Sequence, residues 1–288
     1  MRERDPRIVL GLHRSRHERR LLTSALELGI NAVDTSFNYH GFSSHTVLRA
    51  IGRDLLPHFE LSTKVGFFPT ANRAEHSLDP GRLRGAIERS NRDLGRAPDL
   101  VFLHNPERSL TGVGSSAADQ DKLGTACAAL AEAAAGGLCG GWGISSWDPR
   151  PLPSLVDGTV PKPDVVMVRA GLTAGIDVLE ASELLAVCWS LGIAELWGMS
   201  PFGGSAKDPL WDKLDPGVFI QDRDEGLSTV QAAFRTAYRL PRVGRIAVGT
   251  DDPSHLRELV ATLRYEVNAD TLLMYRRLLR ERAAPQPL

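Results

Sequence analysis

Three short runs of sequence decide the fold of this chain: NAVDT (31–35), FELSTKV (59–65) and LVFLH (100–104). Each run is rich in apolar, β-branched or aromatic residues, and stretches with the apolar spacing of amphipathic helices lie between them. Strands that alternate with helices are typical of βαβ units, in which the strands form a parallel sheet. The three runs therefore predict an α/β fold.

The same alternation continues on both sides of these runs. The other predicted strands are 7–12, 140–145, 164–168, 194–200 and 245–249, and the predicted helices are 16–29, 43–54, 79–95, 118–136, 177–191, 224–239, 253–264 and 270–283. Two of the helices begin at Asp79-Pro80 and Asp252-Pro253, which place a carboxylate at the N-cap and proline at the first helical position. Eight strands and eight helices without a long linker favour a single (β/α)8 TIM barrel, and a doubly wound open sheet is the alternative. We expect one domain over residues 1–288, with a disordered tail from about residue 283.

The composition points to a small-molecule partner. The 34 Lys and Arg residues balance 35 Asp and Glu residues, so no overall field draws the chain to nucleic acid or to an anionic membrane. Charged residues follow Met1 directly, and nowhere do about 18 apolar residues run together, so we expect neither a signal peptide nor a membrane span. These features predict a cytoplasmic protein, and they leave its oligomeric state open.

The three cysteines, Cys127, Cys139 and Cys188, do not have the spacing of metal ligands and cannot all pair with one another. We therefore expect reduced, buried thiols and no metal site.

Polar side chains end the three runs that define the fold. Asp34 and Lys64 lie near the ends of the first and second runs, and His104 ends the third. Tyr39 follows Asp34 within the next loop. Because the carboxyl ends of parallel strands meet at one face, these four side chains are expected to lie together.

A buried lysine in an apolar strand needs a partner, and Asp34 is the expected one. The lysine charge is then expected to lower the pKa of Tyr39 and make the phenol a usable proton donor at neutral pH. Taken singly, an Asp–Lys pair is often a structural bridge and a strand-end histidine is often a core residue. The four residues together predict a proton-transfer site.

At these residues the sequence resembles the aldo-keto reductase family. The matching segments run through most of the chain: GINAVDTSFNY (29–39), LSTKVG (61–66), DLVFLHNPE (99–107), GWGISS (141–146), MSPFGG (199–204) and IAVGTDDPSHLREL (246–259). The resemblance implies a (β/α)8 barrel, NADPH as the usual hydride source, and Tyr39 as a general acid. It also implies that Lys64 and Asp34 tune this acid and that His104 orients the carbonyl.

The cofactor side departs from the family pattern at several positions. The resemblance places cofactor contacts at Ser145, Ser146, Met167, Met199, Ser200, Gly249, Thr250 and Glu258. Met167 stands where the family usually has glutamine, Met199 where it usually has an aromatic residue, and Leu259 where it usually has asparagine. Asp251 and Asp252 stand near the expected 2'-phosphate. Asp252 has an explanation as a helix cap, whereas Asp251 has none, so both NADPH and NADH remain open and a 2'-hydroxyl would tolerate Asp251 better.

Other residues could also reach the site. His13 and Arg14 follow the first strand, and Arg169 could bind a carboxylate or a phosphate or lie on the surface. His40 stands where the family commonly has glycine, and His45 where it usually has glutamate. A second imidazole beside Tyr39 could be catalytic or could bind an acidic substrate, and the alternative is a solvated loop histidine. The segments 108–121 and 201–223 are candidate substrate loops, the second because it carries Phe202, Trp211 and Phe219.

Three functions are consistent with these patterns. The favoured one is an NAD(P)H-dependent oxidoreductase acting on a small-molecule carbonyl or alcohol. The alternative is a non-redox lyase, dehydratase or isomerase that uses the same four residues without bound nicotinamide. A nucleotide-binding sensor or subunit is the third, and the intact set of four residues argues against it.

Overall fold

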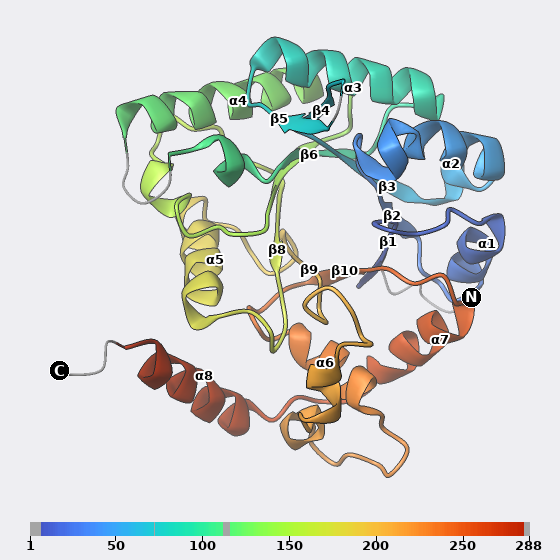
Figure 1. Cartoon of the computed structure of the whole chain (residues 1–288), viewed down its shortest axis with the longest axis vertical. Helices are drawn as coiled ribbons and strands as arrows, with labels where there is room; N and C mark the ends of the chain where they lie inside the picture. Colours follow the sequence, from blue (N-terminus) through green and yellow to red (C-terminus); the bar gives the residue numbers. More distant parts are fainter. Residues whose placement is uncertain (1–6, 72, 112–115, 285–288) are drawn as a thin grey trace.

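Eight parallel strands close into a barrel in a computed structural model, which describes residues 7–71, 73–111 and 116–284 (Figure 1). The barrel strands are β1 (Ile8–Gly11), β2 (Ala32–Asp34), β3 (Glu60–Val65), β6 (Leu100–His104), β7 (Trp142–Ser146), β8 (Val165–Arg169), β9 (Leu196–Met199) and β10 (Arg245–Val248). β1 pairs with both β2 and β10, which closes the sheet. The prediction of a TIM barrel is confirmed, and the open-sheet alternative is wrong.

Helices surround the strands (Figure 1). They are α1 (Arg19–Glu27), α2 (Ser44–Gly52), α3 (Pro80–Leu94), α4 (Ala117–Ala135), α5 (Ile176–Cys188), α6 (Thr229–Ala237), α7 (Pro253–Thr262) and α8 (Ala269–Ala283). The side chains of Asp79 and Asp252 accept hydrogen bonds from the backbone N–H groups of Arg82 and Ser254, at 2.8 and 2.9 Å. Both predicted caps are therefore confirmed, because each carboxylate satisfies an N–H group that has no partner within the helix.

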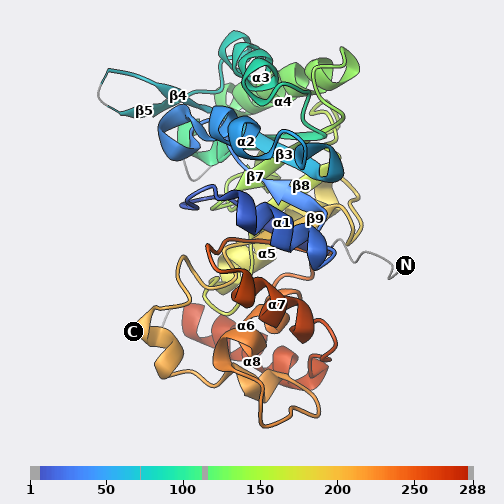
Figure 2. The same ribbon diagram turned by 90° about the vertical axis from the view of Figure 1, so that its right-hand side faces the viewer.

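A 3-10 turn at Pro153–Leu155 is the only helical element between β7 and β8, a segment that is described throughout and in which no helix was predicted. Two local features differ from the prediction. Helix α6 begins at Thr229 and not at residue 224, because Ser228 and Gln231 form a capping box there. The antiparallel hairpin β4 (Phe67–Pro69) and β5 (Ala74–His76), which projects from the barrel in Figure 2, was not predicted. Its strands are too short for an apolar period to reveal them.

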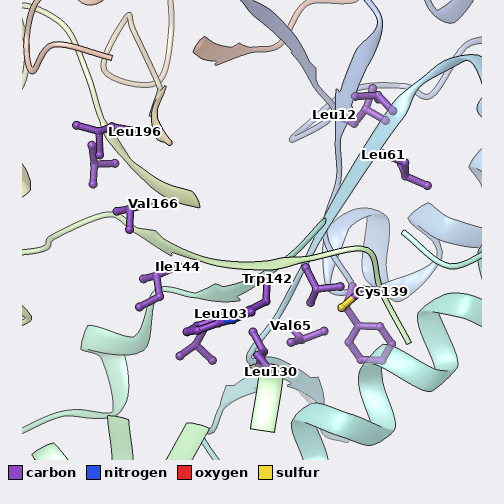
Figure 3. Packing of buried hydrophobic residues seen from close by; sticks show 14 of the residues in the cluster. Leu12, Leu61, Val65, Leu103, Leu130, Cys139, Trp142, Ile144, Val166 and Leu196 are labelled. Atoms are coloured by element: carbon purple, nitrogen blue, oxygen red, sulfur yellow. The ribbon is translucent and has the colours of Figure 1, made fainter. Parts of the chain in front are cut away.

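Successive side chains of a strand point to opposite faces of the sheet, and this divides the core into two layers. Leu103, Ile144 and Val166 belong to the layer between the strands and the helices (Figure 3). Their neighbours Phe102 and Met167 fill the barrel interior, in a cluster completed by Val9, Ala32, Leu100, Trp197 and Ala247. Side chains two residues apart share a face of a strand. The carboxyl-terminal residues of the inward series therefore end at one mouth of the barrel.

The cysteines only partly follow the prediction. Cys127 and Cys139 are buried free thiols, and burial raises their pKa values to about 12 and about 11. Cys188 is exposed, so the expectation of burial is wrong for this residue. It lies in the last turn of α5 next to exposed Val187, on the solvent side of the helix.

Within the ranges described above, no helix is both long and apolar enough to cross a membrane. Helix α8 extends to Ala283, and residues 285–288 lie outside the described part of the chain, so the predicted tail is not tested.

Candidate active site

A cleft of about 1100 Å³ opens at the carboxyl ends of the barrel strands. Asp34, Tyr39, Lys64 and His104 all line it. The segments that follow β1, β9 and β10 form much of the remaining wall and contribute His13, Arg14, Arg16, Ser200, Phe202, Lys207, Gly249, Thr250, Asp251 and Glu258, and further lining residues are Phe67, Asn105, Arg108 and Trp147. The structure thus brings together the four side chains that the sequence pattern placed at strand ends.

Lys64 is the centre of a buried polar network. Its ammonium forms an ion pair with Asp34 and donates hydrogen bonds to the Thr35 carbonyl oxygen at 3.0 Å and to the Tyr39 hydroxyl at 3.4 Å. Asp34 also accepts a hydrogen bond from Ser62 Oγ at 2.8 Å. The Lys64 side chain is 2% exposed, so these partners together compensate the loss of hydration.

The turn that holds Tyr39 has an unusual backbone. Tyr39 begins the 3-10 helix Tyr39–Phe42, and its N–H donates to the Ser36 carbonyl oxygen at 3.1 Å. His40, Gly41 and Phe42 have φ angles of 51°, 61° and 67°. Left-handed backbone costs energy at residues other than glycine and concentrates at functional sites. This compact turn places the phenol next to Lys64.

His104 lies next to Tyr39 with its ring in a T-shaped arrangement, 6.2 Å between centroids. Its Nδ1 is 3.1 Å from Ser36 Oγ. His76 on β5 lies behind it, with Nε2 at 2.8 Å from the His104 carbonyl oxygen, and Phe67 packs against the His104 ring at 4.9 Å. His76 and Phe67 were missed by the sequence reasoning, because both belong to the unpredicted hairpin.

The titration behaviour of the network follows from burial. Burial raises the pKa of Tyr39, and the Lys64 charge lowers it only in part, so the expectation of a lowered pKa is wrong. Burial alone would lower the pKa of Lys64, but Asp34 and Tyr39 outweigh it and the pKa is raised. Burial and then Lys64 lower the pKa of His104 well below its ordinary value. At neutral pH the network therefore holds a protonated phenol, an ammonium ion and a neutral imidazole.

The positions expected to contact nicotinamide differ in their placement. Met167 and Met199 line the cleft. Ser145 shares the inward face with them and, like Met167, is fully buried; its hydroxyl donates to Met199 Sδ at 3.9 Å. Ser146 points to the opposite face of β7 and donates to the carboxylate of Glu107 at 2.9 Å. Neither serine lines the cleft, so their predicted contacts remain a prediction.

Glu107 holds the segment after β7 in place. Besides Ser146, its carboxylate accepts hydrogen bonds from the backbone N–H groups of Trp147 at 2.9 Å and Asp148 at 3.1 Å. Burial raises the pKa of Glu107, although these hydrogen bonds oppose the shift. Trp147 lines the cleft, and the Arg169 guanidinium lies over its ring at 4.8 Å and donates to the Thr173 carbonyl oxygen at 3.2 Å. Arg169 thus supports Trp147.

The segment after β10 holds the other expected cofactor positions, Gly249, Thr250 and Glu258, and all three line the cleft. Asp251, which the sequence left without an explanation, accepts hydrogen bonds from Ser15 Oγ at 3.1 Å and from the Arg16 backbone N–H at 3.0 Å. It therefore ties the loop after β10 to the loop after β1.

His45 lies outside the cleft and away from solvent. It is 2% exposed on α2, and its Nε2 lies 2.8 Å from Thr63 Oγ1. Burial lowers its pKa to about 4. It does not line the cleft, and its burial contradicts the expectation of a solvated histidine. His40 is exposed, with its ring 5.2 Å from that of His17.

The second candidate loop is only partly at the site. Phe202 lines the cleft, and Trp211 packs on it edge to face at 6.1 Å. Phe219 is buried against Tyr275 of α8 at 5.3 Å, away from the cleft lining. Of the first loop, 108–121, residues 112–115 lie outside the described part of the chain, and α4 already begins at Ala117.

No cluster of three or more His, Cys, Asp or Glu side chains that could hold a metal ion occurs among residues 7–71, 73–111 and 116–284.

Solved structures with the same fold are numerous. An aldo-keto reductase from Bacillus halodurans in its holo form superposes with a TM-score of 0.71 and 17% identity, over 95% of this chain and 91% of that chain. An aldo-keto reductase from Klebsiella pneumoniae in complex with NADPH gives 0.67 and 18% identity, over 98% and 93%. A glycerol dehydrogenase from Gluconobacter oxydans gives 0.69 and 16% identity, also over 98% and 93%. At such identities the likeness shows a shared fold.

Among curated proteins, no sequence matches this chain. The sequence does match the model of the aldo/keto reductase family over residues 13–277, which is most of its length. The chain belongs to the aldo/keto reductase family.

Proposed function

We propose that this chain is an NAD(P)H-dependent oxidoreductase that reduces an aldehyde or ketone to an alcohol, or catalyses the reverse oxidation. Membership of the aldo/keto reductase family supports oxidoreductase activity in general. The finer proposal rests on one observation: the Lys64 ammonium contacts both Asp34 and the Tyr39 hydroxyl within the cleft, beside His104.

Tyr39 is the proposed general acid. A buried phenol with a raised pKa is protonated at neutral pH, as a proton donor must be. When its proton passes to the substrate oxygen, the phenolate that remains lies 3.4 Å from the Lys64 ammonium. This charge stabilises phenolate more than phenol, so it favours the transfer. Asp34 keeps the ammonium charged and oriented.

His104 is the proposed residue that orients the carbonyl. A neutral imidazole has one N–H donor, and donation from Ser36 Oγ to Nδ1 would leave that proton on Nε2. In the structure, however, Ser36 Oγ donates to the side-chain oxygen Oδ1 of Asn38 at 2.6 Å. Because a hydroxyl donates only one hydrogen bond, this tautomer requires Asn38 to direct its NH2 group to Ser36.

The cleft offers groups along its length that could hold a nicotinamide dinucleotide. It extends from the four polar residues to the start of α7, past the turn that contains Gly203 and Gly204, whose φ angles are 67° and 122°. Met167 and Met199 would pack on the nicotinamide ring, Gly204 and Lys207 would lie near the phosphates, and Thr250 and Glu258 near the adenosine. When bound, the cofactor would donate or accept the hydride. The Klebsiella pneumoniae relative in complex with NADPH supports a nicotinamide cofactor in general.

We propose that NADH binds more tightly than NADPH. Asp251 and Asp252 both line the adenosine end of the cleft, where a 2'-phosphate would add two negative charges. Asp251 cannot readily turn away, because Ser15 and Arg16 hold its carboxylate.

A second candidate is a non-redox lyase, dehydratase or isomerase that uses the same proton donor. One observation favours it: Ser146 is bound to Glu107, and two thioethers stand where the family usually has an amide and an aromatic ring. A nicotinamide carboxamide would then find fewer polar partners.

Titration of the purified protein with NADH and NADPH, followed by fluorescence or calorimetry, separates the two candidates. The reductase proposal predicts binding of at least one of them, and no binding even in the millimolar range would overturn it. A Tyr39→Phe variant is expected to lose about 10²- to 10⁴-fold in kcat while it keeps its cofactor affinity. Full activity in this variant would contradict both enzymatic candidates.

A further inference from the structure

We propose that the carbonyl substrate carries a carboxylate and that Arg14 and Arg108 bind it. This inference rests on the proposed function, because it names the substrate class of the same cleft. Both arginines line the cleft together with Tyr39 and His104. They come from different loops, Arg14 from the loop after β1 and Arg108 from the turn Pro106–Ser109 after β6.

Arg14 stands on a loop that is firmly anchored on its C-terminal side. Asp251 accepts hydrogen bonds from Ser15 and from the backbone N–H of Arg16, and His17 Nε2 lies 2.6 Å from Ser44 Oγ. Arg14 itself has a φ of 60°. A left-handed backbone conformation costs energy at arginine and persists only where the surrounding structure imposes it. Residues in such conformations cluster at ligand sites. The loop therefore holds Arg14 in one strained backbone conformation.

The Arg14 guanidinium has no acidic partner in the part of the chain that the structure describes. The other two arginines near it are already paired, Arg16 with Asp251 and Arg20 with Glu18. An arginine offers five N–H donors in a planar fork that matches a carboxylate. Arg14 is therefore available to an anionic ligand in the cleft.

Arg108 approaches the site from the other side. Its guanidinium lies 5.7 Å from the centroid of Phe67, whose ring packs against His104 at 4.9 Å. No ion pair joins it to an acid within the described ranges. Asn105 adds a possible donor, because its side-chain oxygen accepts the Trp147 N–H at 3.1 Å and its NH2 group has no partner among those same residues.

The charges of the cleft are separated along its length. The acidic residues that line it are Asp34, which Lys64 neutralises, and Asp251, Asp252 and Glu258, which all follow β10. Neither Arg14 nor Arg108 forms an ion pair with an acidic residue in the described part of the chain. Arg108 is among the charges that lower the pKa of His104, after burial and Lys64. Arg14 is the largest cause, after burial, of the lowered pKa of His13, whose ring lies 4.9 Å from that of Tyr39. The reaction end of the cleft is therefore cationic, which favours an anionic substrate.

The phosphates of the cofactor are the other source of negative charge in this cleft. In the proposed function, Lys207 and the turn at Gly203 and Gly204 already bind these phosphates. Measurements of substrate and cofactor affinity on the same variants separate the two sources.

The test compares 4-carboxybenzaldehyde with 4-formylbenzamide, which has nearly the same shape and no charge. We expect the wild type to prefer the acid by about tenfold in kcat/KM, with a preference that falls as ionic strength rises. Arg14→Gln and Arg108→Gln are each expected to lower kcat/KM for the acid about tenfold, to leave the amide nearly unchanged, and to keep the cofactor Kd. Arg14→Lys should retain part of the preference. Arg84→Gln is the control, because Arg84 is exposed on α3, is paired with Glu88 and does not line the cleft.

Two results would overturn the inference. One is equal turnover of the two aldehydes by the wild type. The other is a loss in the glutamine variants that affects both aldehydes equally and weakens cofactor binding, since the arginines would then hold cofactor phosphates.

Failure of the proposed function is distinguishable, because the wild type would then reduce neither aldehyde. In that case calorimetry with benzoate and benzamide still decides whether the anion site exists. Tighter binding of benzoate that is lost in Arg14→Gln supports the site, and equal binding of the two compounds contradicts it.

Discussion

Asp251 accepts two hydrogen bonds from Arg16, one from its backbone N–H at 3.0 Å and one from its guanidinium Nε at 3.3 Å. The contact joins the loop after β10 to the loop after β1 across neighbouring strands of the barrel. It therefore gives Asp251 a structural role, and it also fixes a carboxylate at the end of the cleft where we propose that the adenosine binds.

An Asp251→Asn substitution separates these two roles. Asparagine keeps a side-chain oxygen that can accept from Arg16 and removes the negative charge. We expect the ratio of the NADPH and NADH dissociation constants to shift about tenfold toward NADPH, because repulsion of the 2'-phosphate is relieved. Fluorescence titration with both cofactors measures the ratio. An unchanged ratio would show that Asp251 acts only on the loop.

The Asp34–Lys64 pair makes a prediction about stability. Lys64→Met leaves Asp34 buried without its cation and is expected to lower the free energy of unfolding by about 3–5 kcal/mol. The double variant Asp34→Asn/Lys64→Met removes the unpaired charge and should recover much of this loss. Urea unfolding followed by circular dichroism measures both values. A double variant as unstable as the single one would show that packing of the lysine stem, and not charge, dominates.

The pH dependence of reduction follows from the pKa shifts. Tyr39 must be protonated to donate, and its pKa is raised above 10.0, so the rate falls only as pH rises beyond that value. His104 must be neutral, and its pKa lies well below 6.5, so the rate falls only at acid pH. We expect kcat/KM for reduction to be nearly flat between about pH 7 and pH 9. A fall in kcat/KM centred in that range would assign the acid to another group.

His45 is expected to make the fold sensitive to acid. In the folded protein its pKa is about 4, against 6.5 for an unperturbed histidine, so between these values the unfolded chain binds a proton that the folded chain does not. Stability should therefore fall as pH falls through this window, by up to about 1.4 kcal/mol per pH unit from this residue.

His45→Gln keeps a group that can bond to Thr63 and cannot take up a proton. Its unfolding free energy should decline less between pH 6.5 and about 4 than that of the wild type. Parallel curves for the two proteins would mean that His45 does not titrate in this window.

The barrel and the order of its elements could be predicted from the sequence. The apolar runs before Asp34, Lys64 and His104 are local patterns, and parallel βαβ connection brings their carboxyl ends to one face. The caps at Asp79 and Asp252 were predictable for a similar reason, because an N-cap bond spans only a few residues. The hairpin that carries Phe67 and His76 was not, since each of its strands has three residues.

What the sequence determined by itself is the fold and the gathering of Asp34, Tyr39, Lys64 and His104, because strand period, helix caps and parallel connection are local properties that add up to one topology. Only the tertiary structure decided that burial outweighs Lys64 in the pKa of Tyr39, that Asp251 binds Arg16, and that His45 is buried. It also decided that Arg14 and Arg108 line one cleft from two loops. Desolvation and contacts between distant loops depend on how the whole chain packs, so they cannot be predicted from a local pattern of residues.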